Sequence, residues 1–377
     1  IAQYWKWAKE YYTETSAYGI RASLRVLRDC HGSTDAGSFG PNALRVVRDA
    51  MVLGKAEGKH RRPPWCRKTV NSRVADIVRL FKWAASREIV GPDVYQALNT
   101  LAPLKRGRCA APDHEPVKPV SMELVDAVKP HVSRQVRALI ELQLLCGARP
   151  GELLRLRARD IDTAAHGGGA GATASAVWVY RPSQHKNVHR GKDRSIYFGP
   201  QAQALLAEFM ADRPLDQYLF SPADADLERR AERNARRKTP LSCGNVSGES
   251  IKDDPKWKAG DDYTTASYRR AIERGCDKAF PPPEHLRPRR VPGGRAENDL
   301  QLMARLTPKQ RAELEAWRTA HRWHPNQLRH TSATLIRRQF GLEAAQLVLG
   351  HSSATITDAV YAERDTSKIA DVIRRVG

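Results

Sequence analysis

Apolar residues recur at helical spacing through the first hundred positions of the chain. The clearest segment is 69–85, in which apolar residues lie three or four positions apart: Val70, Val74, Ile77, Val78, Phe81 and Ala84. Shorter patterns of the same kind cover 4–12, 20–27 and 43–53. Basic residues occupy the remaining faces of 69–85, among them Arg73, Arg79 and Lys82. The pattern predicts a helical domain over residues 1–105 with a basic exterior.

The helical pattern breaks between residues 106 and 119. Arg106 and Arg108 are followed there by three prolines, a composition typical of a basic connector between domains. Ser121 then has the side chain of a helix N-cap, and Leu124, Val125 and Val128 form the apolar stripe of the helix behind it. A longer helix is expected over 133–146.

The spacing of apolar residues along the chain changes beyond residue 154. Two short runs rich in β-branched and aromatic residues, 176–180 and 195–198, flank a polar loop and predict a β-hairpin. Residues 221–320 are harder to interpret, although the Arg- and Glu-rich run 228–238 and the segment 308–320 favour helices. The patterns together predict a mainly α chain with a small antiparallel β-sheet.

The net charge narrows the choice of partner. The 377 residues include 63 Lys and Arg but only 42 Asp and Glu, a formal net charge of +21. Such an excess of positive charge favours binding to a polyanion, and nucleic acid is the leading candidate. An anionic membrane surface is the alternative, but no apolar run reaches the roughly 20 residues of a membrane span. No signal-peptide pattern precedes the first predicted helix, and the sequence leaves open whether Ile1 is the natural N-terminus.

Six cysteines are scattered along the chain without a CxxC pair. This spacing argues against a zinc site and against a disulfide framework. Free thiols in a reducing cytosol are therefore expected, and no metal site is predicted.

Two arginines have sequence surroundings that suit phosphate binding. Arg149 lies where Gly147 and Pro150 interrupt a helix, and Glu152, three positions later, is within reach of its side chain. Arg329 lies at a helix start. A guanidinium fork can grip two phosphate oxygens, whereas the ordinary alternative for each residue is an exposed arginine at a helix end.

Further candidates lie in the hairpin loop and near the end of the sequence. Lys186 could protonate a departing oxygen, with Lys192 as the competing residue for this role and DNA-backbone contact as the alternative for both. His351 can donate a hydrogen bond to a phosphate, or simply cap a turn. Tyr361 has a hydroxyl that can attack phosphorus, although a lone tyrosine near a C-terminus usually serves packing.

These motifs resemble those of the tyrosine recombinase (phage integrase) family. The matching elements are G-x-R-x-x-E-L at 147–153, L-R-H-T at 328–331, L-G-H at 349–351 and Tyr361. The resemblance implies a helical core-binding domain over 1–105, a linker over 106–119, and an integrase-type α+β catalytic domain over 120–377 with an insertion at about 221–320.

The sequence departs from the family pattern in two places. Asn326 stands where the family usually has a histidine, and Tyr361 lies one residue further from the L-G-H motif than expected. Asparagine can hydrogen-bond a phosphate oxygen but cannot accept a proton at neutral pH. The general base therefore stays open among His330, His324, water and the phosphate itself.

The resemblance implies a site-specific recombinase that cuts and rejoins DNA through a 3′-phosphotyrosine and a four-way junction, without metal or cofactor. Tyr361 would attack, Arg149 and Arg329 would neutralise the phosphate, Lys186 would protonate the leaving 5′ oxygen, and His351 and Asn326 would add hydrogen bonds. Glu152 and His330 would support this set. The contacts expected with double-stranded DNA involve six basic residues: Arg73, Arg79, Lys82, Arg106, Arg108 and Lys192.

The implied assembly is a homotetramer on DNA, formed when the apolar stripe of 368–376 docks on a neighbouring protomer. Packing of that segment on its own domain is the alternative. Accessory DNA-bending factors and a cytoplasmic, nucleoid-associated location in a prokaryotic-type cell, on a mobile element, complete the expectation.

Three rival functions remain. A type IB topoisomerase would use the same chemistry as a monomer and rejoin the original strand. A non-catalytic DNA-binding protein would keep the fold, and its biology would be unchanged by Tyr361→Phe. An RNA-binding protein fits the charge but leaves the motif spacing unexplained.

Overall fold

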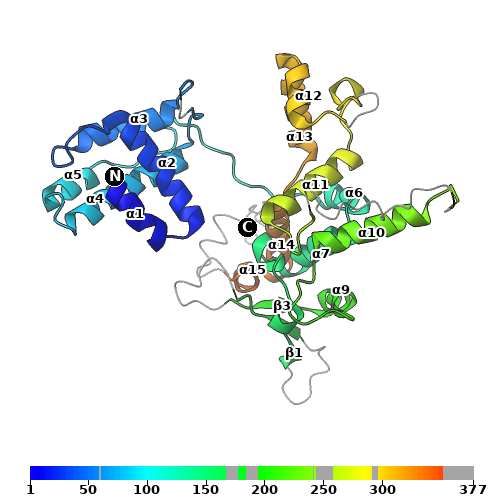
Figure 1. Cartoon of the computed structure of the whole chain (residues 1–377). Coiled ribbons are helices and arrows are strands. Elements are labelled where there is room, and N and C mark those ends of the chain that lie inside the picture. Colours follow the sequence, from blue (N-terminus) through cyan, green and yellow to red (C-terminus); the bar gives the residue numbers. More distant parts are fainter. Residues whose placement is uncertain are drawn as a thin grey trace, which may run out of the picture. The chain divides into compact units, whose positions relative to one another are not determined.

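A computed structural model describes residues 1–58, 61–166, 177–183, 194–240, 242, 258–290 and 296–350. The chain divides into two units, Ile1–Pro116 and Val117–Gly377, which are described separately below (Figure 1). Nowhere in the described ranges is there a helix that is both long enough and apolar enough to cross a membrane.

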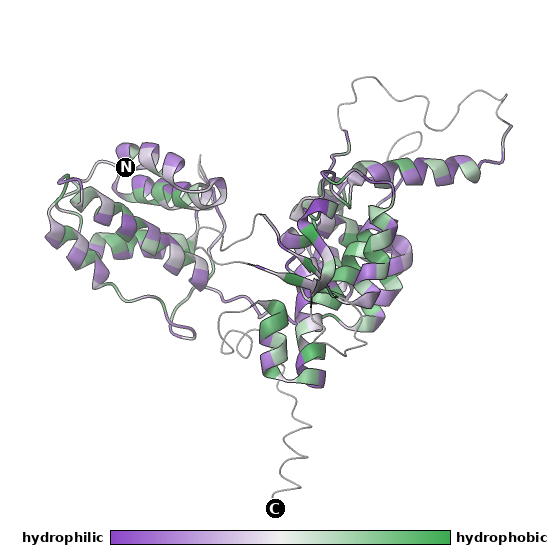
Figure 2. Cartoon of the chain, turned by 90° about the horizontal axis from the view of Figure 1, so that it is seen from below, coloured by the Kyte–Doolittle hydropathy of each residue, from purple (hydrophilic) through white to green (hydrophobic). Residues whose placement is uncertain are grey.

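The first unit is a bundle of helices. Its elements are α1 (Ala2–Tyr11), α2 (Glu14–His31), α3 (Pro41–Leu53), α4 (Arg67–Ala85) and α5 (Pro92–Asn99). Apolar side chains from all of them meet in one core, and polar residues cover the outer faces of the helices (Figure 2). The helices predicted over 4–12, 20–27, 43–53 and 69–85 are confirmed. Helix α5 was not predicted, because only Val94 and Leu98 of its eight residues are buried, too few to produce a periodic pattern.

Helix α4 is joined to α2 by a buried carboxylate. Asp76 is 6% exposed and accepts a hydrogen bond from the Ser23 hydroxyl of α2 at 2.9 Å. Arg73 and Arg79, one turn to either side on α4, each place a guanidinium nitrogen 3.0 Å from the same carboxylate. A buried charge is tolerated when it is paired and hydrogen-bonded in this way. Two of the predicted DNA-contacting arginines are therefore held by Asp76.

The second unit is larger and mixes helices with a small sheet. Its helices are α6 (Met122–Val128), α7 (Arg134–Cys146), α8 (Pro150–Leu153), α9 (Pro200–Met210), α10 (Pro222–Ala235), α11 (Thr265–Ala279), α12 (Asp299–Arg305), α13 (Pro308–His321), α14 (Pro325–Phe340) and α15 (Leu342–Leu349). The expected N-cap is present, since the Ser121 hydroxyl accepts from the Leu124 amide at 3.4 Å. The predicted helix over 133–146 corresponds to α7, with Ser133 as its cap.

The sheet has the strand order β1-β2-β3, with β1 (Ile161–His166), β2 (Val177–Tyr180) and β3 (Ile196–Phe198) all antiparallel to their neighbours. Strand β2 pairs with β3 in the register Trp178 opposite Phe198, which confirms the predicted hairpin. Strand β1 was not predicted, because its sequence, IDTAAH, lacks the aromatic and β-branched run that marks the other two strands.

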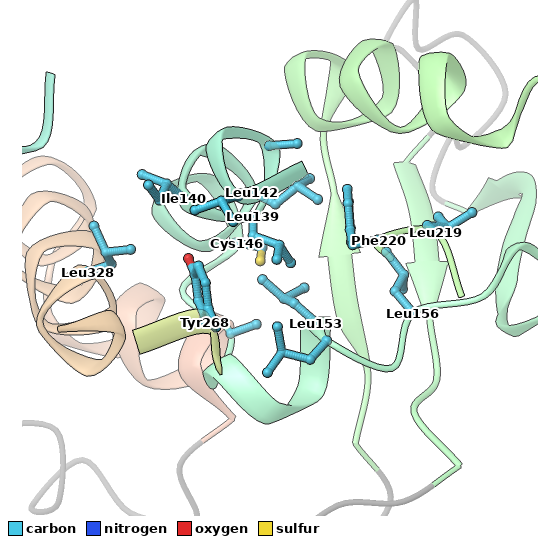
Figure 3. Close-up of a cluster of buried hydrophobic side chains, with 14 of the residues drawn as sticks. Leu139, Ile140, Leu142, Cys146, Leu153, Leu156, Leu219, Phe220, Tyr268 and Leu328 are labelled. Carbon is cyan, nitrogen blue, oxygen red and sulfur yellow. The ribbon is translucent and has the colours of Figure 1, made fainter. Parts of the chain in front are cut away.

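Helix α7 lies at the centre of the core of this unit. It packs against Phe220 and against Tyr268 of α11 through three of its side chains, Leu139, Leu142 and Cys146 (Figure 3). Leu328 of α14 joins the same cluster. Burying these side chains stabilises the packing of helices that are far apart in sequence.

Part of the region predicted as an insertion, about 221–320, belongs to this core, because α11 contributes Tyr268, Ile272 and Cys276. A separate small cluster of Leu286, Leu302, Leu306 and Leu314 lies under α12 and α13. Helix α10 has no buried residue and extends away from the rest of its unit (Figure 1).

Candidate active site

Arg149 lies at the turn between α7 and α8. Helix α7 ends at Cys146, Gly147 takes the left-handed conformation with φ 60°, and Arg149 is the N-cap of α8. Its Nη1 atom donates to Glu152 Oε1 at 2.9 Å, and its backbone amide donates to Glu152 Oε2 at 2.8 Å. Glu152 therefore fixes the direction of an arginine side chain that is 34% exposed.

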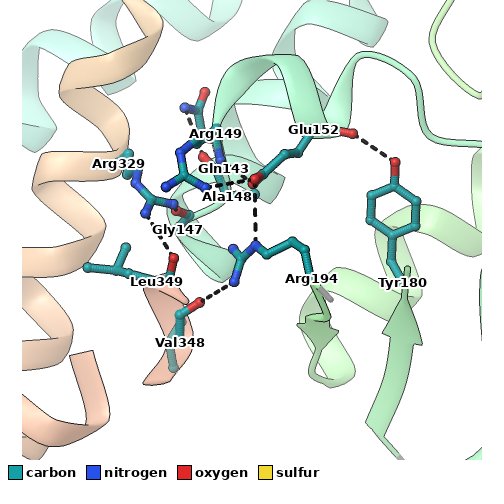
Figure 4. Close-up of polar contacts among 10 residues, drawn as sticks. All are labelled: Gln143, Gly147, Ala148, Arg149, Glu152, Tyr180, Arg194, Arg329, Val348 and Leu349. Atoms are coloured by element: carbon teal, nitrogen blue, oxygen red, sulfur yellow. Dashed lines mark hydrogen bonds and ion pairs between the residues drawn. The ribbon is translucent and has the colours of Figure 1, made fainter. Parts of the chain in front are cut away.

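Arg329 reaches the same turn from α14. It is 2% exposed, and its Nη1 atom donates to the Gly147 carbonyl oxygen at 2.6 Å, across 182 positions of sequence. Its Nη2 atom donates to the Leu349 carbonyl oxygen at the end of α15, at 2.9 Å. The two arginines that the sequence motifs selected therefore come together around one turn, as Figure 4 shows.

The whole L-R-H-T segment faces inward. Leu328 lies in the core, and His330 and Thr331 are buried beside Arg329. The Thr331 hydroxyl donates to the Val120 carbonyl at 2.8 Å and accepts from the Val120 amide at 3.0 Å. This motif thus anchors the start of the second unit as well as carrying a candidate phosphate ligand.

A third guanidinium was missed by sequence reasoning. Arg194, just before β3, is 8% exposed. Its Nε atom lies 3.6 Å from Glu152 Oε1, and its Nη1 atom donates to the Val348 carbonyl at 3.5 Å (Figure 4). The only signal in the sequence was the position of this arginine directly before an apolar strand, which does not reveal that it is buried.

Glu152 is the negative centre of the cluster. Burial, the largest single influence, raises its pKa. The charge of Arg194, the hydrogen bond from the Arg149 amide and the charge of Arg149 together outweigh burial and leave the pKa below its ordinary value. Glu152 is therefore ionised at neutral pH. Its carbonyl oxygen accepts a hydrogen bond from the Tyr180 hydroxyl at 2.9 Å, which joins this turn to β2.

Two glycines allow the close approach of these elements. A Cβ atom on Gly147 would lie 2.9 Å from Leu349 Cδ2 and 3.1 Å from Ser332 Oγ. Gly350 is also left-handed, with φ 63°, and a Cβ atom there would overlap the Arg194 guanidinium. Glycine is the residue that fits both the conformation and the space.

The histidines near Arg329 are weak bases. Burial, assisted by the charges of Arg329 and His324, lowers the pKa of His330 to about 4. Burial, followed by the charge of Arg269, also lowers the pKa of His324. A base with a pKa near 4 accepts protons poorly at neutral pH, which disfavours His330 among the candidate general bases. Asn326 is exposed on the first turn of α14.

Four of the predicted site residues lie outside the described residues: Lys186, Lys192, His351 and Tyr361. The C-terminal stripe at 368–376 also lies outside them. Of the other predicted DNA contacts, Arg79, Lys82, Arg106 and Arg108 are exposed and Arg73 is half-buried.

Comparison with known proteins identifies the fold. No family model and no curated protein matches the sequence. Among solved structures, a lambda integrase (75–356) dimer bound to a COC′ core site is 14% identical, with 97% of this chain and 94% of that chain covered and a TM-score of 0.52. The Tn1549 transposon integrase (82–397) in complex with circular intermediate DNA is 16% identical, with 97% and 95% covered and a TM-score of 0.52.

The chain has the integrase fold. The fold implied by the resemblance to tyrosine recombinases, mainly helical with a small antiparallel sheet, is thus confirmed. In the second unit, the integrase fold brings Arg149 and Arg329 to one turn.

Proposed function

We propose that the chain is a site-specific tyrosine recombinase that cuts and rejoins duplex DNA. The observation that carries the proposal is the hydrogen bond from Arg329 to the Gly147 carbonyl, two positions before Arg149. It brings two guanidinium groups from distant parts of the sequence to one turn, where they can bind the non-bridging oxygens of a single phosphate.

The proposed reaction is an in-line displacement at phosphorus. The Tyr361 hydroxyl gives its proton to the general base, for which His324, water and the phosphate itself are the candidates. Its oxygen forms a bond to the scissile phosphorus as the bond to the 5′ oxygen breaks, which leaves a 3′-phosphotyrosine. Lys186 gives a proton to the departing oxygen, and a free 5′-hydroxyl results. Arg149 and Arg329 stabilise the negative charge that develops on the phosphate, while His351 and Asn326 add hydrogen bonds. Attack by a 5′-hydroxyl of another strand reverses these steps and joins the new partner.

DNA is the proposed substrate on two further grounds. The net charge of +21 favours a polyanion. The lambda and Tn1549 integrase structures that share the fold contain bound DNA. In the proposal, the duplex is contacted from the hairpin loop by Lys192 and from the first unit by five basic residues: Arg73, Arg79, Lys82, Arg106 and Arg108.

The proposed active assembly is a tetramer on DNA, held by docking of residues 368–376 on a neighbouring protomer. The apolar residues of that segment, Ile369, Val372, Ile373 and Val376, recur at helical spacing. A helix this short is marginal alone and is stabilised by a partner surface.

The test is whether the protein forms a covalent adduct with DNA while a chelator removes metal ions. The protein is incubated with nicked duplexes from candidate element ends and with supercoiled plasmid, and denaturing gels are scored for a protein–DNA adduct. The proposal expects an adduct that is absent with Tyr361→Phe. An adduct that persists in that variant would overturn the assignment of the nucleophile. A monomer as the active species on DNA would indicate topoisomerase activity instead.

A further inference from the structure

Arg194 connects three parts of the site that come from different regions of the chain. It leads into β3, its Nε atom lies 3.6 Å from the Glu152 carboxylate of α8, and its Nη1 atom donates to the Val348 carbonyl of α15. Glu152 in turn holds both the side chain and the backbone amide of Arg149. Figure 4 shows Arg194 between Glu152 and Val348, with Arg149 on the far side of the carboxylate.

Burying the charged side chain of Arg194 costs free energy unless a group of opposite charge compensates it. Both partners of its ion pair are almost completely inaccessible, with side-chain exposures of 7% for Arg194 and 5% for Glu152. Within the described ranges, Arg194 Nε and Nη2 have no hydrogen-bond partner, so the carboxylate of Glu152 is the main compensation for the buried cation. Replacing such a pair by apolar residues is often neutral or stabilising, and this pair is therefore poorly explained by stability alone.

We propose that Arg194 is a positioning residue, which fixes Glu152, and through it Arg149, against the end of α15. The inference rests on the proposed function, since it assigns Arg149 to the phosphate. Arg194 sets the place and the charge of the carboxylate to which Arg149 is bound, and it need not touch DNA.

The charge on Glu152 is the part of this role that can be measured. The groups that face Glu152 are Arg149 beside it, Arg194 from the start of β3, the Tyr180 hydroxyl from β2 on its carbonyl, and the Cys146 thiol from α7. Burial is the largest influence on the pKa of Glu152 and acts to raise it, whereas Arg194 is the largest opposing influence. Without Arg194, burial dominates and Glu152 takes up a proton at a higher pH. A neutral carboxyl holds the Arg149 guanidinium less strongly.

The first experiment measures the rate of adduct formation across about pH 5.5 to 8.5. Arg194→Met is expected to lower the rate at least about tenfold near neutral pH and to recover part of it as pH rises. Arg194→Lys keeps a positive charge beside Glu152 without the fork, so it is expected to be slower than wild type with the wild-type pH profile. Arg181→Met is the matched control, because it removes an arginine whose exposed ion pair with Asp162 lies on the same sheet.

Two results would overturn the inference. One is an Arg194→Met variant as fast as wild type. The other is a slow variant whose pH profile is that of wild type, which would point to a general loss of packing. If the wild-type protein forms no adduct at all, the proposed function fails, and the role of Arg194 is decided by a second measurement that needs no DNA.

That second measurement is the free energy of unfolding in urea as a function of pH. In wild type, the lowered pKa of Glu152 contributes stability above the unfolded pKa, and this contribution is lost as pH falls. In Arg194→Met the pKa of Glu152 in the folded protein lies higher than in wild type. The difference in unfolding free energy between wild type and variant is therefore expected to widen as pH rises from acid to neutral. In a Glu152→Gln background the same difference should not depend on pH. A pH-dependent difference that survives in that background would contradict the coupling.

Discussion

The guanidinium of Arg329 donates a hydrogen bond to the carbonyl oxygen of Gly147 at 2.6 Å. This contact joins the second turn of α14 to the end of α7, and Arg149 follows Gly147 by two positions. The same guanidinium holds the Leu349 carbonyl at 2.9 Å. A residue proposed to bind phosphate thus also maintains the geometry of the site, so its replacement is expected to affect both stability and activity.

Replacing Arg329 by Met is expected to lower the free energy of unfolding by about 2 to 4 kcal/mol. The variant leaves the buried carbonyls of Gly147 and Leu349 without their donor, and a buried unsatisfied polar group costs about 1 to 3 kcal/mol. Urea unfolding followed by circular dichroism measures the change. Arg338→Met, at an exposed position of the same helix, is the control and should change stability by less than about 0.5 kcal/mol. Equal losses in both variants would contradict the role assigned to Arg329.

Gly147→Ala is expected to destabilise the second unit by about 1 to 3 kcal/mol. The backbone there is left-handed with φ 60°, and the added methyl group would lie 2.9 Å from Leu349 Cδ2. Gly151→Ala is the matched control four positions later, because a Cβ atom there has nothing within 4 Å and the residue lies in α8. Thermal unfolding compares the two variants. A Gly147→Ala protein as stable as Gly151→Ala would show that the turn tolerates a side chain.

Asp76→Asn is expected to lower the stability of the first unit by about 2 to 4 kcal/mol, because Arg73 and Arg79 lose the charge of their shared buried partner. The comparison is with Asp49→Asn, whose side chain is 58% exposed and pairs only weakly with Arg48 at 3.6 Å. Urea denaturation of both proteins is the measurement. A small and equal effect at the two positions would show that Asp76 does not hold α2 against α4.

His330 is expected to make the protein less stable in acid. Its pKa in the folded protein, about 4, lies below the ordinary value of 6.5, so the unfolded chain binds the proton more tightly. The contribution of His330 to the free energy of unfolding is therefore fully present above about pH 6.5 and is lost as pH drops toward 4. His330→Gln removes this contribution, whereas His131→Gln, at an exposed position, should keep it. The check is the slope of unfolding free energy against pH, and an unchanged slope in His330→Gln would contradict the assignment.

The helices of the first unit and the hairpin of the second could be predicted, because their apolar residues follow one period over many positions. Helix α11 was missed although its buried residues Tyr268, Ile272 and Cys276 lie four positions apart, because an apolar stripe of about one residue per turn is narrow and most of the other residues of the helix are polar or charged. The candidate site could likewise be predicted only where its residues belong to a sequence motif. Arg149 and Arg329 carry motifs, whereas the burial of Arg194 depends on contacts with Glu152 and Val348, which sequence spacing does not encode.

The proposed recombinase chemistry is tested most directly by identifying the residue that becomes bound to DNA. The wild-type adduct is digested with nuclease and protease, and the peptide that carries nucleotide is located by mass spectrometry. We expect a nucleotide linked through its 3′-phosphate to Tyr361, in an amount that falls at least about tenfold in Arg149→Met and Arg329→Met proteins that remain folded. A nucleotide on any other residue, or an adduct that both arginine variants form at the wild-type rate, would contradict the proposed chemistry.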